Sequence, residues 1–341
     1  MLDTTHEVFA AKRRGIKRRI DELKRRDSLK KYAEHWRGLE LKPLKRVIGA
    51  EDGSANHKKY KSIVFYAANA LALIYDDGLE EYKCSDIDIL YPYRDVENRL
   101  AIYRSILELK ASLQALDKVD LFLIDGSIFT DLVTSRGVDK GLRQEDVKEV
   151  VELLPELEAA EGATIASKEL ACELNGNSMD KIVFLEYLEY LSCLQKLLEK
   201  GHDKLVGISK TSTRAEFNEG IPDMAIFEEI TMDAGYSKPT SDLFPIWKKF
   251  PIYHEFFKNF VFTTCYARLE DRKGVLLVEF PREITEGEVE EALRAIGSTS
   301  VMGYPYLLRK AHREAVITNR EMQKLALSLG IVEKTGREVL G

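Results

Sequence analysis

The sequence predicts an α/β fold whose core is a mixed sheet with helical insertions and a long N-terminal helix. Apolar stretches of strand length occur at residues 45–52, 62–75 and 82–90, and turn-forming residues follow the first two. A helical pattern follows at 95–116, and a short apolar stretch occurs at 121–125. The order strand, strand, strand, helix, strand is typical of an RNase H-like core, in which a meander and a crossover helix bring the fourth strand beside the first.

The N-terminus is predicted to form one long basic helix over residues 5–35. Phe9, Ile16 and Ile20 recur at helical spacing, and Lys and Arg fill the other faces. Residues 1–46 hold 15 Lys or Arg against 7 Asp or Glu, a local charge of +8 in a chain whose net charge is −6, which leaves −14 for the remainder. A basic arm on an acidic body indicates contact with nucleic acid or an acidic partner, or it is a solvated helix that is basic by chance.

The rest of the chain is predicted to be one elaborated domain, because no linker, repeat or low-complexity tract divides it. We therefore assign residues 1–44 to the basic amphipathic helix and residues 45–341 to the RNase H-like domain, with a helical insertion around 140–200. Further expected elements are a strand at 205–210, a hairpin formed by 260–269 and 275–280, and helices at 286–296, 306–317 and 319–329.

Cysteine usage and hydropathy exclude several classes of protein. Cys84, Cys172, Cys193 and Cys265 are scattered without a C-x-x-C pair, so neither a zinc site nor a disulfide framework is indicated. The N-terminus is charged, and no apolar run approaches the roughly 18 residues of a membrane span. We expect a cytoplasmic protein that does not insert into a membrane.

Two predicted strands run into the same residue types, Glu51-Asp52-Gly53-Ser54 and Ile124-Asp125-Gly126-Ser127. A carboxylate at the end of a buried strand is costly unless it is paired or binds a metal ion. If the strands are neighbours, both carboxylates reach one edge of the sheet, where oxygen ligands bind a hard divalent cation. The alternative is two ordinary Asp-Gly turns.

The predicted helix at 95–116 offers a third carboxylate. Glu108 lies in a stripe of small residues at helical spacing, which comprises Ala101, Ser105, Ser112 and Ala115. Such a face can pack closely on a sheet, although a solvated Glu is the alternative. Asp52, Glu108 and Asp125 together would form a three-carboxylate site for two metal ions, the arrangement that supports phosphoryl transfer.

A histidine near the C-terminus is a further candidate ligand. In the segment GYPYLLRKAHREA, Pro305 suits the first turn of a helix and places His312 about two turns in. Imidazole is a better ligand for manganese than for magnesium, but a lone His on a helix is more often structural. Tyr304 would then lie about 10 Å from His312 along the helix axis, so both could not bind one ion.

This ordered set of residues resembles the NurA family of archaeal nucleases. The family has an Asp-Gly-Ser after its first strand, a Glu on the next helix, a second Asp, and a Tyr and a His near the C-terminus. These correspond here to Asp52, Glu108, Asp125, Tyr304 and His312, over about residues 45–315.

The resemblance implies a function. It implies an RNase H-like fold and a homodimer. It also implies a site for two metal ions, either Mn²⁺ or Mg²⁺, whose ligands are Asp52, Glu108, Asp125 and His312. It also implies 5′–3′ degradation of DNA, cleavage of single strands, and double-strand break processing with the hexameric ATPase HerA. Lys210 resembles a family Lys near the site that could contact a phosphate.

Two other readings stay open. The chain could be an RNase H-like nuclease that acts on RNA or RNA–DNA hybrids, since the same carboxylates serve both substrates. It could also be a non-catalytic DNA-binding subunit of a motor ATPase. The set of Asp52, Glu108 and Asp125 argues against this, because a binding module does not need three buried acids. The sequence contains no Walker A motif, so the chain itself is not expected to be the motor.

Overall fold

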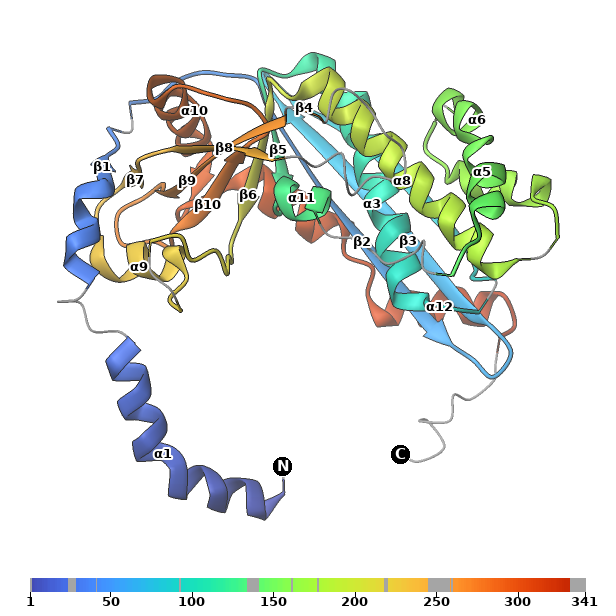
Figure 1. Ribbon diagram of the computed structural model, residues 1–341, viewed down its shortest axis with the longest axis horizontal. Coiled ribbons are helices and arrows are strands. Elements are labelled where there is room, and N and C mark those ends of the chain that lie inside the picture. Colours follow the sequence, from blue (N-terminus) through green and yellow to red (C-terminus); the bar gives the residue numbers. More distant parts are fainter. Residues whose placement is uncertain are drawn as a thin grey trace.

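The computed structural model describes residues 2–331, except 24–28, 41, 92, 134–140, 161, 177, 218–219, 245–257 and 259. One large mixed sheet runs through the molecule (Figure 1). Its strands follow the order β1-β7-β9-β10-β6-β5-β2-β3-β4, and β8 pairs with β9. No helix in this part of the chain is both long and apolar enough to cross a membrane.

The centre of the sheet has the predicted order of elements. Strands β2 (Ile48–Lys59), β3 (Val64–Tyr75) and β4 (Leu79–Ile89) form an antiparallel meander. Helix α3 (Val96–Ala115) then crosses over, and β5 (Leu121–Asp125) returns parallel to β2. The expectation that the fourth strand lies beside the first is confirmed.

Strands on the other side of β5 extend the sheet. β6 (Leu205–Ser209) runs parallel to β5, and the predicted hairpin is formed by β9 (Phe260–Arg268) and β10 (Leu276–Phe280). The sequence did not predict three short strands at this end of the sheet, which are β1 (Trp36–Gly38), β7 (Gly235–Ser237) and β8 (Thr240–Phe244).

Strand β2 is longer than predicted. We expected it to end at Asp52 in an Asp-Gly turn, but it continues to Lys59, and all its residues pair with β3. The reason is the length of β3, whose twelve residues offer a partner to each residue of β2. Gly53 is therefore a position within a strand and not a turn.

Two apolar layers cover the two faces of the sheet. On one face, α3 packs on the even-numbered residues of β3 from Val64 to Ile74, and α8 (Met179–Gly201) packs against α3. On the other face, α10 (Glu286–Ser298) and α11 (Tyr306–Ala315) pack on β2, β5 and the odd-numbered Leu71 and Leu73. The alternation follows from the two-residue repeat of a strand. It places α3 and α11 on opposite sides of β2.

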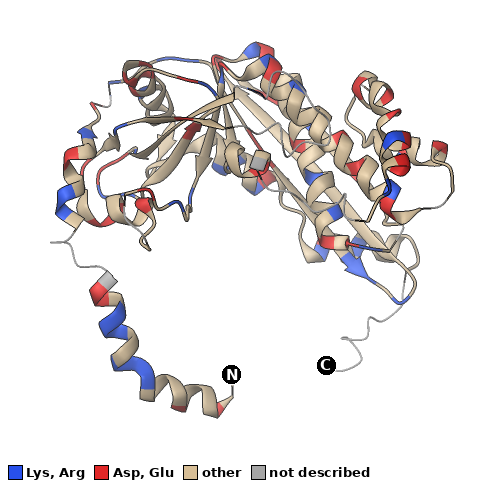
Figure 2. Ribbon diagram, in the orientation of Figure 1, with Lys and Arg blue, Asp and Glu red and all other residues tan. Residues whose placement is uncertain are grey.

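The N-terminal region differs from one continuous helix. Helix α1 (Asp3–Leu23) lies away from the body, and Lys and Arg residues cover much of it (Figures 1 and 2). Its described side chains are exposed, except for the half-buried Ile16. Residues 24–28 of the predicted helix lie outside the described residues, and Lys30–His35 is a 3-10 helix. This helix leads into β1, which pairs with β7, so the predicted helix is wrong beyond residue 29.

The insertion between β5 and β6 is helical, as predicted. It contains α4 (Ile128–Val133), α5 (Gln144–Val151), α6 (Leu154–Ala159), α7 (Ala166–Leu170) and α8. Helix α12 (Asn319–Ser328) was predicted, as were α10 and α11. Helix α9 (Asp223–Ile230) was not predicted. Two short strands, β11 (Ser300–Val301) and β12 (Tyr304–Pro305), precede α11.

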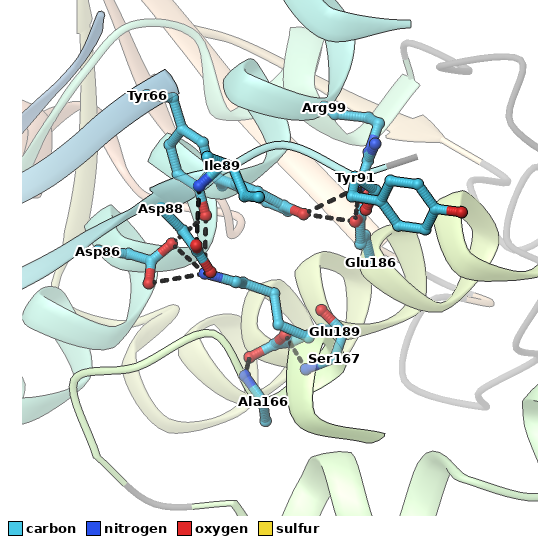
Figure 3. Close-up of polar contacts among 12 residues, drawn as sticks. Tyr66, Asp86, Asp88, Ile89, Tyr91, Arg99, Ala166, Ser167, Glu186 and Glu189 are labelled. Carbon is cyan, nitrogen blue, oxygen red and sulfur yellow. Dashed lines mark hydrogen bonds and ion pairs between the residues drawn. The ribbon is translucent and has the colours of Figure 1, made fainter. Parts of the chain in front are cut away.

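Buried ion pairs join the insertion to α3 (Figure 3). Arg99 on α3 donates to both carboxylate oxygens of Glu186 on α8, at 2.8 and 2.6 Å. Lys110 likewise contacts Glu189 at 2.7 Å, and Glu189 also accepts from the backbone N–H groups of Ala166 and Ser167. Because the carboxylates are satisfied on several sides, these charges are tolerated in the interior and fix α8 against α3.

Candidate metal centre

Three side chains from three elements meet beside the centre of the sheet. Asp52 comes from β2, Asp125 from the end of β5, and His312 from α11. One ligand atom of each lies within 4.8 Å of the others. His312 Nδ1 lies 2.7 Å from Asp52 Oδ2. The parallel pairing of β2 with β5 brings the two carboxylates together, and α11 lies across β2 on the same face.

Lys210 and Tyr304 complete this cluster through Asp125. Lys210 follows β6 and donates from Nζ to Asp125 Oδ2 at 2.9 Å, while the Tyr304 hydroxyl donates to Oδ1 at 3.2 Å. The Lys210 ammonium also lies 4.8 Å from the Tyr304 ring centroid. Burial, and then the charge of Asp125, raise the pKa of Tyr304, which keeps its hydroxyl a donor. Tyr304 thus contacts Asp125 while His312 contacts Asp52, which agrees with the expectation that Tyr304 and His312 do not bind the same ion.

Glu108 lies apart from this cluster. It points from α3, on the opposite face of β2, and Arg104 Nε lies 3.2 Å from its Oε1. The predicted close packing is present at Gly53, because a Cβ added there would lie 2.6 Å from Glu108 Oε1. Burial and the nearby Asp52 raise the pKa of Glu108 to about 7 although Arg104 opposes the shift. The small-residue stripe therefore indicated the packing correctly, but the structure does not bring Glu108 among the three clustered ligands.

Sequence reasoning missed Glu51. Its side chain is buried on the α3 side of β2, next to Asp52 in the chain but on the opposite face. It lines a cavity of about 40 Å³ together with Glu108 and Ser105, and its Oε2 has no hydrogen-bond partner among the described residues. Burial, and then Glu108, raise the pKa of Glu51 well above its usual range. The sequence signal that could have identified Glu51 is its position as an acidic residue at the end of the apolar strand, directly before Asp52.

Comparison with known proteins then relates this geometry to a family. A sequence model described as the NurA domain matches residues 46–317, which include all six predicted site residues. This chain belongs to the NurA family.

Relatives in this family align along most of their length. The chain is 32% identical to the probable DNA double-strand break repair nuclease NurA of Methanocaldococcus jannaschii over 320 residues, 85% of this chain and 80% of the relative. It is 25% identical to the DNA double-strand break repair nuclease NurA of Sulfurisphaera tokodaii, over 98% of this chain and 97% of the relative.

Solved NurA structures have the same fold. The crystal structure of the Sulfolobus solfataricus NurA nuclease superposes with a TM-score of 0.79 at 23% identity, over 97% of both chains. A NurA crystal structure described as bound to dAMP and manganese superposes with a TM-score of 0.71 at 16% identity, over the whole of both chains. The NurA fold thus extends over nearly the whole chain.

The donor atoms of the cluster suit a manganese ion. Two carboxylates and one imidazole within 4.8 Å of one another offer oxygen and nitrogen ligands, a set that a divalent transition metal binds readily. The pKa of Asp52 is raised, first by burial and then by the charge of Asp125. A bound cation would relieve this repulsion, so the electrostatics of the cluster favour a cation.

The raised pKa of Glu108 predicts that the stability of the metal-free protein depends on pH. The folded chain keeps a proton up to about pH 7, whereas an unfolded Glu loses it near 4.5. Raising the pH through this window therefore lowers the free energy of unfolding, by at most about 3 kcal/mol. Glu108→Gln has no such carboxyl, so its stability advantage over the wild type should grow from pH 4.5 to 7. Melting curves in EDTA test this, and a constant difference would contradict it.

Proposed function

We propose that this chain is a metal-dependent DNA nuclease that hydrolyses phosphodiester bonds at the cluster of Asp52, Asp125 and His312. The observation that carries the proposal is the convergence of these three ligands with Lys210 and Tyr304. Membership of the NurA family supports it, because relatives in this family are named DNA double-strand break repair nucleases.

The residues of the cluster have separate tasks in this proposal. Asp52, Asp125 and His312 would hold one ion, and Glu108 would serve a second one from the other side of β2. Bound ions activate a water molecule and stabilise the charge that develops on phosphate oxygens. The Lys210 ammonium, which now pairs with Asp125, would contact the phosphate, and the Tyr304 hydroxyl would hold Asp125 in its orientation.

The family also guides finer proposals. We infer 5′–3′ exonuclease and single-strand endonuclease activity, action as a homodimer with a HerA-type ATPase in break repair, and a cytoplasmic location. The absence of a Walker A motif from the sequence supports a separate motor subunit.

A cleavage assay tests the proposed function. End-labelled single-stranded DNA, duplex DNA and RNA would be incubated with the protein in Mn²⁺, Mg²⁺ or EDTA. We expect DNA cleavage with Mn²⁺ and none in EDTA. Cleavage of RNA or hybrids alone would support the second candidate substrate, and DNA binding without any cleavage would support a non-catalytic subunit.

Removal of His312 is expected to weaken metal binding. His312→Ala deletes an imidazole that lies 2.7 Å from Asp52, while the two carboxylates stay in place. We therefore expect cleavage to persist at a raised Mn²⁺ concentration, about tenfold above that of the wild type, which is the usual scale for a lost ligand or its support. Titration of activity with Mn²⁺ measures this, and His35→Ala removes a half-buried histidine outside the cluster as a control. Equal Mn²⁺ requirements for all three proteins would show that His312 is not a ligand.

Deletion of helix α1 is expected to impair DNA binding or dimerisation. The helix carries exposed Arg13, Arg14, Lys17 and Arg18 in addition to the apolar residues at helical spacing, and the rest of the chain is acidic. The deletion of Asp3–Leu23 leaves β1 in the sheet. Changing the four basic residues to Gln should reduce the salt dependence of DNA affinity by about 0.9 in slope per lost phosphate contact. Unchanged affinity, salt slope and oligomeric mass in both variants would contradict both roles.

A further inference from the structure

A pocket lies at the ends of β5 and β6, next to the cluster of Asp52, Asp125 and His312. It has a volume of about 430 Å³ and is formed by the residues that follow these strands, with β10 as its floor. Ser127 comes two residues after Asp125, and Thr211 directly follows Lys210. The two segments that supply Asp125 and Lys210 therefore continue into the walls of the pocket. Its lining residues are Ser127, Phe129, Thr130, Thr211, Ser212, Thr213, Arg214, Leu277 and Glu279.

The charges around this pocket do not favour a phosphate. Among the described residues that line it, Arg214 is the only basic one. Its guanidinium pairs with Glu216 and lies 3.6 Å from Asp242, while its buried Nη1 has no hydrogen-bond partner among the described residues. Glu279 lies beneath the pocket and is only 1% exposed. A bound anion would face this carboxylate, and the guanidinium that could offset it already lies beside two acidic side chains.

The neutral groups of the pocket suit a flat heterocycle. Five of the nine lining residues carry hydroxyl groups, each of which can donate or accept a hydrogen bond. Phe129 and Leu277 add apolar surface, and the Arg214 guanidinium lies 5.6 Å from the Phe129 ring centroid. Hydroxyl groups adapt to any base edge, so such a pocket would not select one base over another.

The walls are held in place before any ligand binds. Glu279 accepts hydrogen bonds from Ser127 Oγ at 2.9 Å and from the Phe129 backbone N–H at 3.3 Å. The Phe129 ring packs against Phe244 and Phe262, with centroids 4.4 and 5.5 Å apart. A ligand would therefore meet a largely preformed pocket, which reduces the entropic cost of binding.

We propose that this pocket binds the unstacked base of a nucleotide that neighbours the scissile phosphate. The proposal rests on the proposed nuclease function and names the group that positions the strand. A base in this pocket has left the duplex stack, so the DNA must be single-stranded or frayed there. The pocket thus favours single strands and opened ends over an intact duplex.

A scan with abasic residues tests this in the wild-type protein. A single-stranded oligonucleotide would carry one abasic residue, moved by one nucleotide at a time, and kcat/KM would be measured for one defined bond with Mn²⁺. We expect a loss of about tenfold or more at one position next to that bond, since contacts with individual bases contribute strongly to the binding of single strands. If kcat/KM were the same for every position of the abasic residue, the proposal would be overturned. Absence of any DNA cleavage would instead overturn the proposed nuclease function and, with it, this subsite.

Variants then connect the sensitive position to the pocket. Thr130→Phe places a ring at the pocket wall, and Thr240→Phe makes the same change at an exposed site outside it. Thr130→Phe should slow cleavage of the intact strand about tenfold and abolish the effect of the abasic residue, with Thr240→Phe like the wild type. An unchanged abasic effect in Thr130→Phe and in the milder Thr130→Val would overturn the proposal. Sensitivity to a neutral methylphosphonate, but not to base removal, would identify a phosphate site instead and also overturn it.

Discussion

Replacement of Asp52 by Asn is expected to abolish DNA cleavage while the fold stays intact. Asp52 supplies a carboxylate to the cluster and accepts from His312, and Asn has the same shape without the charge that holds a cation. Transition-state stabilisation by a metal ion is worth several kcal/mol. Since each 1.4 kcal/mol is a factor of ten in rate, the loss should reach about a thousandfold. Asp125→Asn should behave in the same way.

The stability of Asp52→Asn separates a catalytic role from a structural one. Burial and the charge of Asp125 raise the pKa of Asp52, so its ionised form is disfavoured in the folded state. The neutral Asn removes this repulsion, and the melting temperature without metal should be equal to or above that of the wild type. Asp77→Asn, which alters an exposed carboxylate far from the cluster in the chain, is the matched control for activity. An Asp52→Asn protein with near-normal activity would remove this residue from the site.

Replacement of Arg99 by Met is expected to produce the largest loss of stability. Arg99 and Glu186 are 0% and 1% exposed, and the guanidinium donates to both carboxylate oxygens. Removing the cation leaves a buried carboxylate without its charge partner, at a cost of about 3–5 kcal/mol. In thermal melting this corresponds to a decrease of roughly 5–15 °C.

Two comparisons isolate the buried charge as the cause. Arg94→Met breaks the exposed pair with Asp180, whose side chains are 47% and 38% exposed, and should cost under about 1 kcal/mol. The double variant Arg99→Met/Glu186→Met replaces both charges with apolar groups and should recover much of the loss. If Arg99→Met were no less stable than Arg94→Met, the ion pair would not hold α8 on α3.

The sequence predicted the order of the central strands and the five residues of the cluster, which are Asp52, Asp125, Lys210, Tyr304 and His312. The meander was visible because β3 is a long apolar strand, and Asp125 because a short apolar strand runs directly into it. His312 and Tyr304 are distant from Asp52 and Asp125 in the chain, and only the resemblance to NurA connected them before the structure showed their contacts.

Other features depend on tertiary pairing that no local pattern records. The polar half of β2 after Asp52 is a strand because β3 offers it a partner, and β1 is a strand only because β7 lies beside it. The position of Glu108 depends on Gly53, whose role changed from a turn to a site of close packing. Glu51 was passed over because one acid in an apolar run does not show which face of the sheet it occupies.

The most direct test of the proposed nuclease site is the location of manganese in crystals of the wild-type protein grown with Mn²⁺. Anomalous scattering at the manganese absorption edge identifies the ion without reference to the protein geometry. The proposal predicts a peak bounded by the carboxylates of Asp52 and Asp125 and the imidazole of His312, with the His312–Asp52 hydrogen bond broken. A fully occupied peak elsewhere, with His312 still bonded to Asp52 and with Lys210 and Tyr304 still bonded to Asp125, would contradict it.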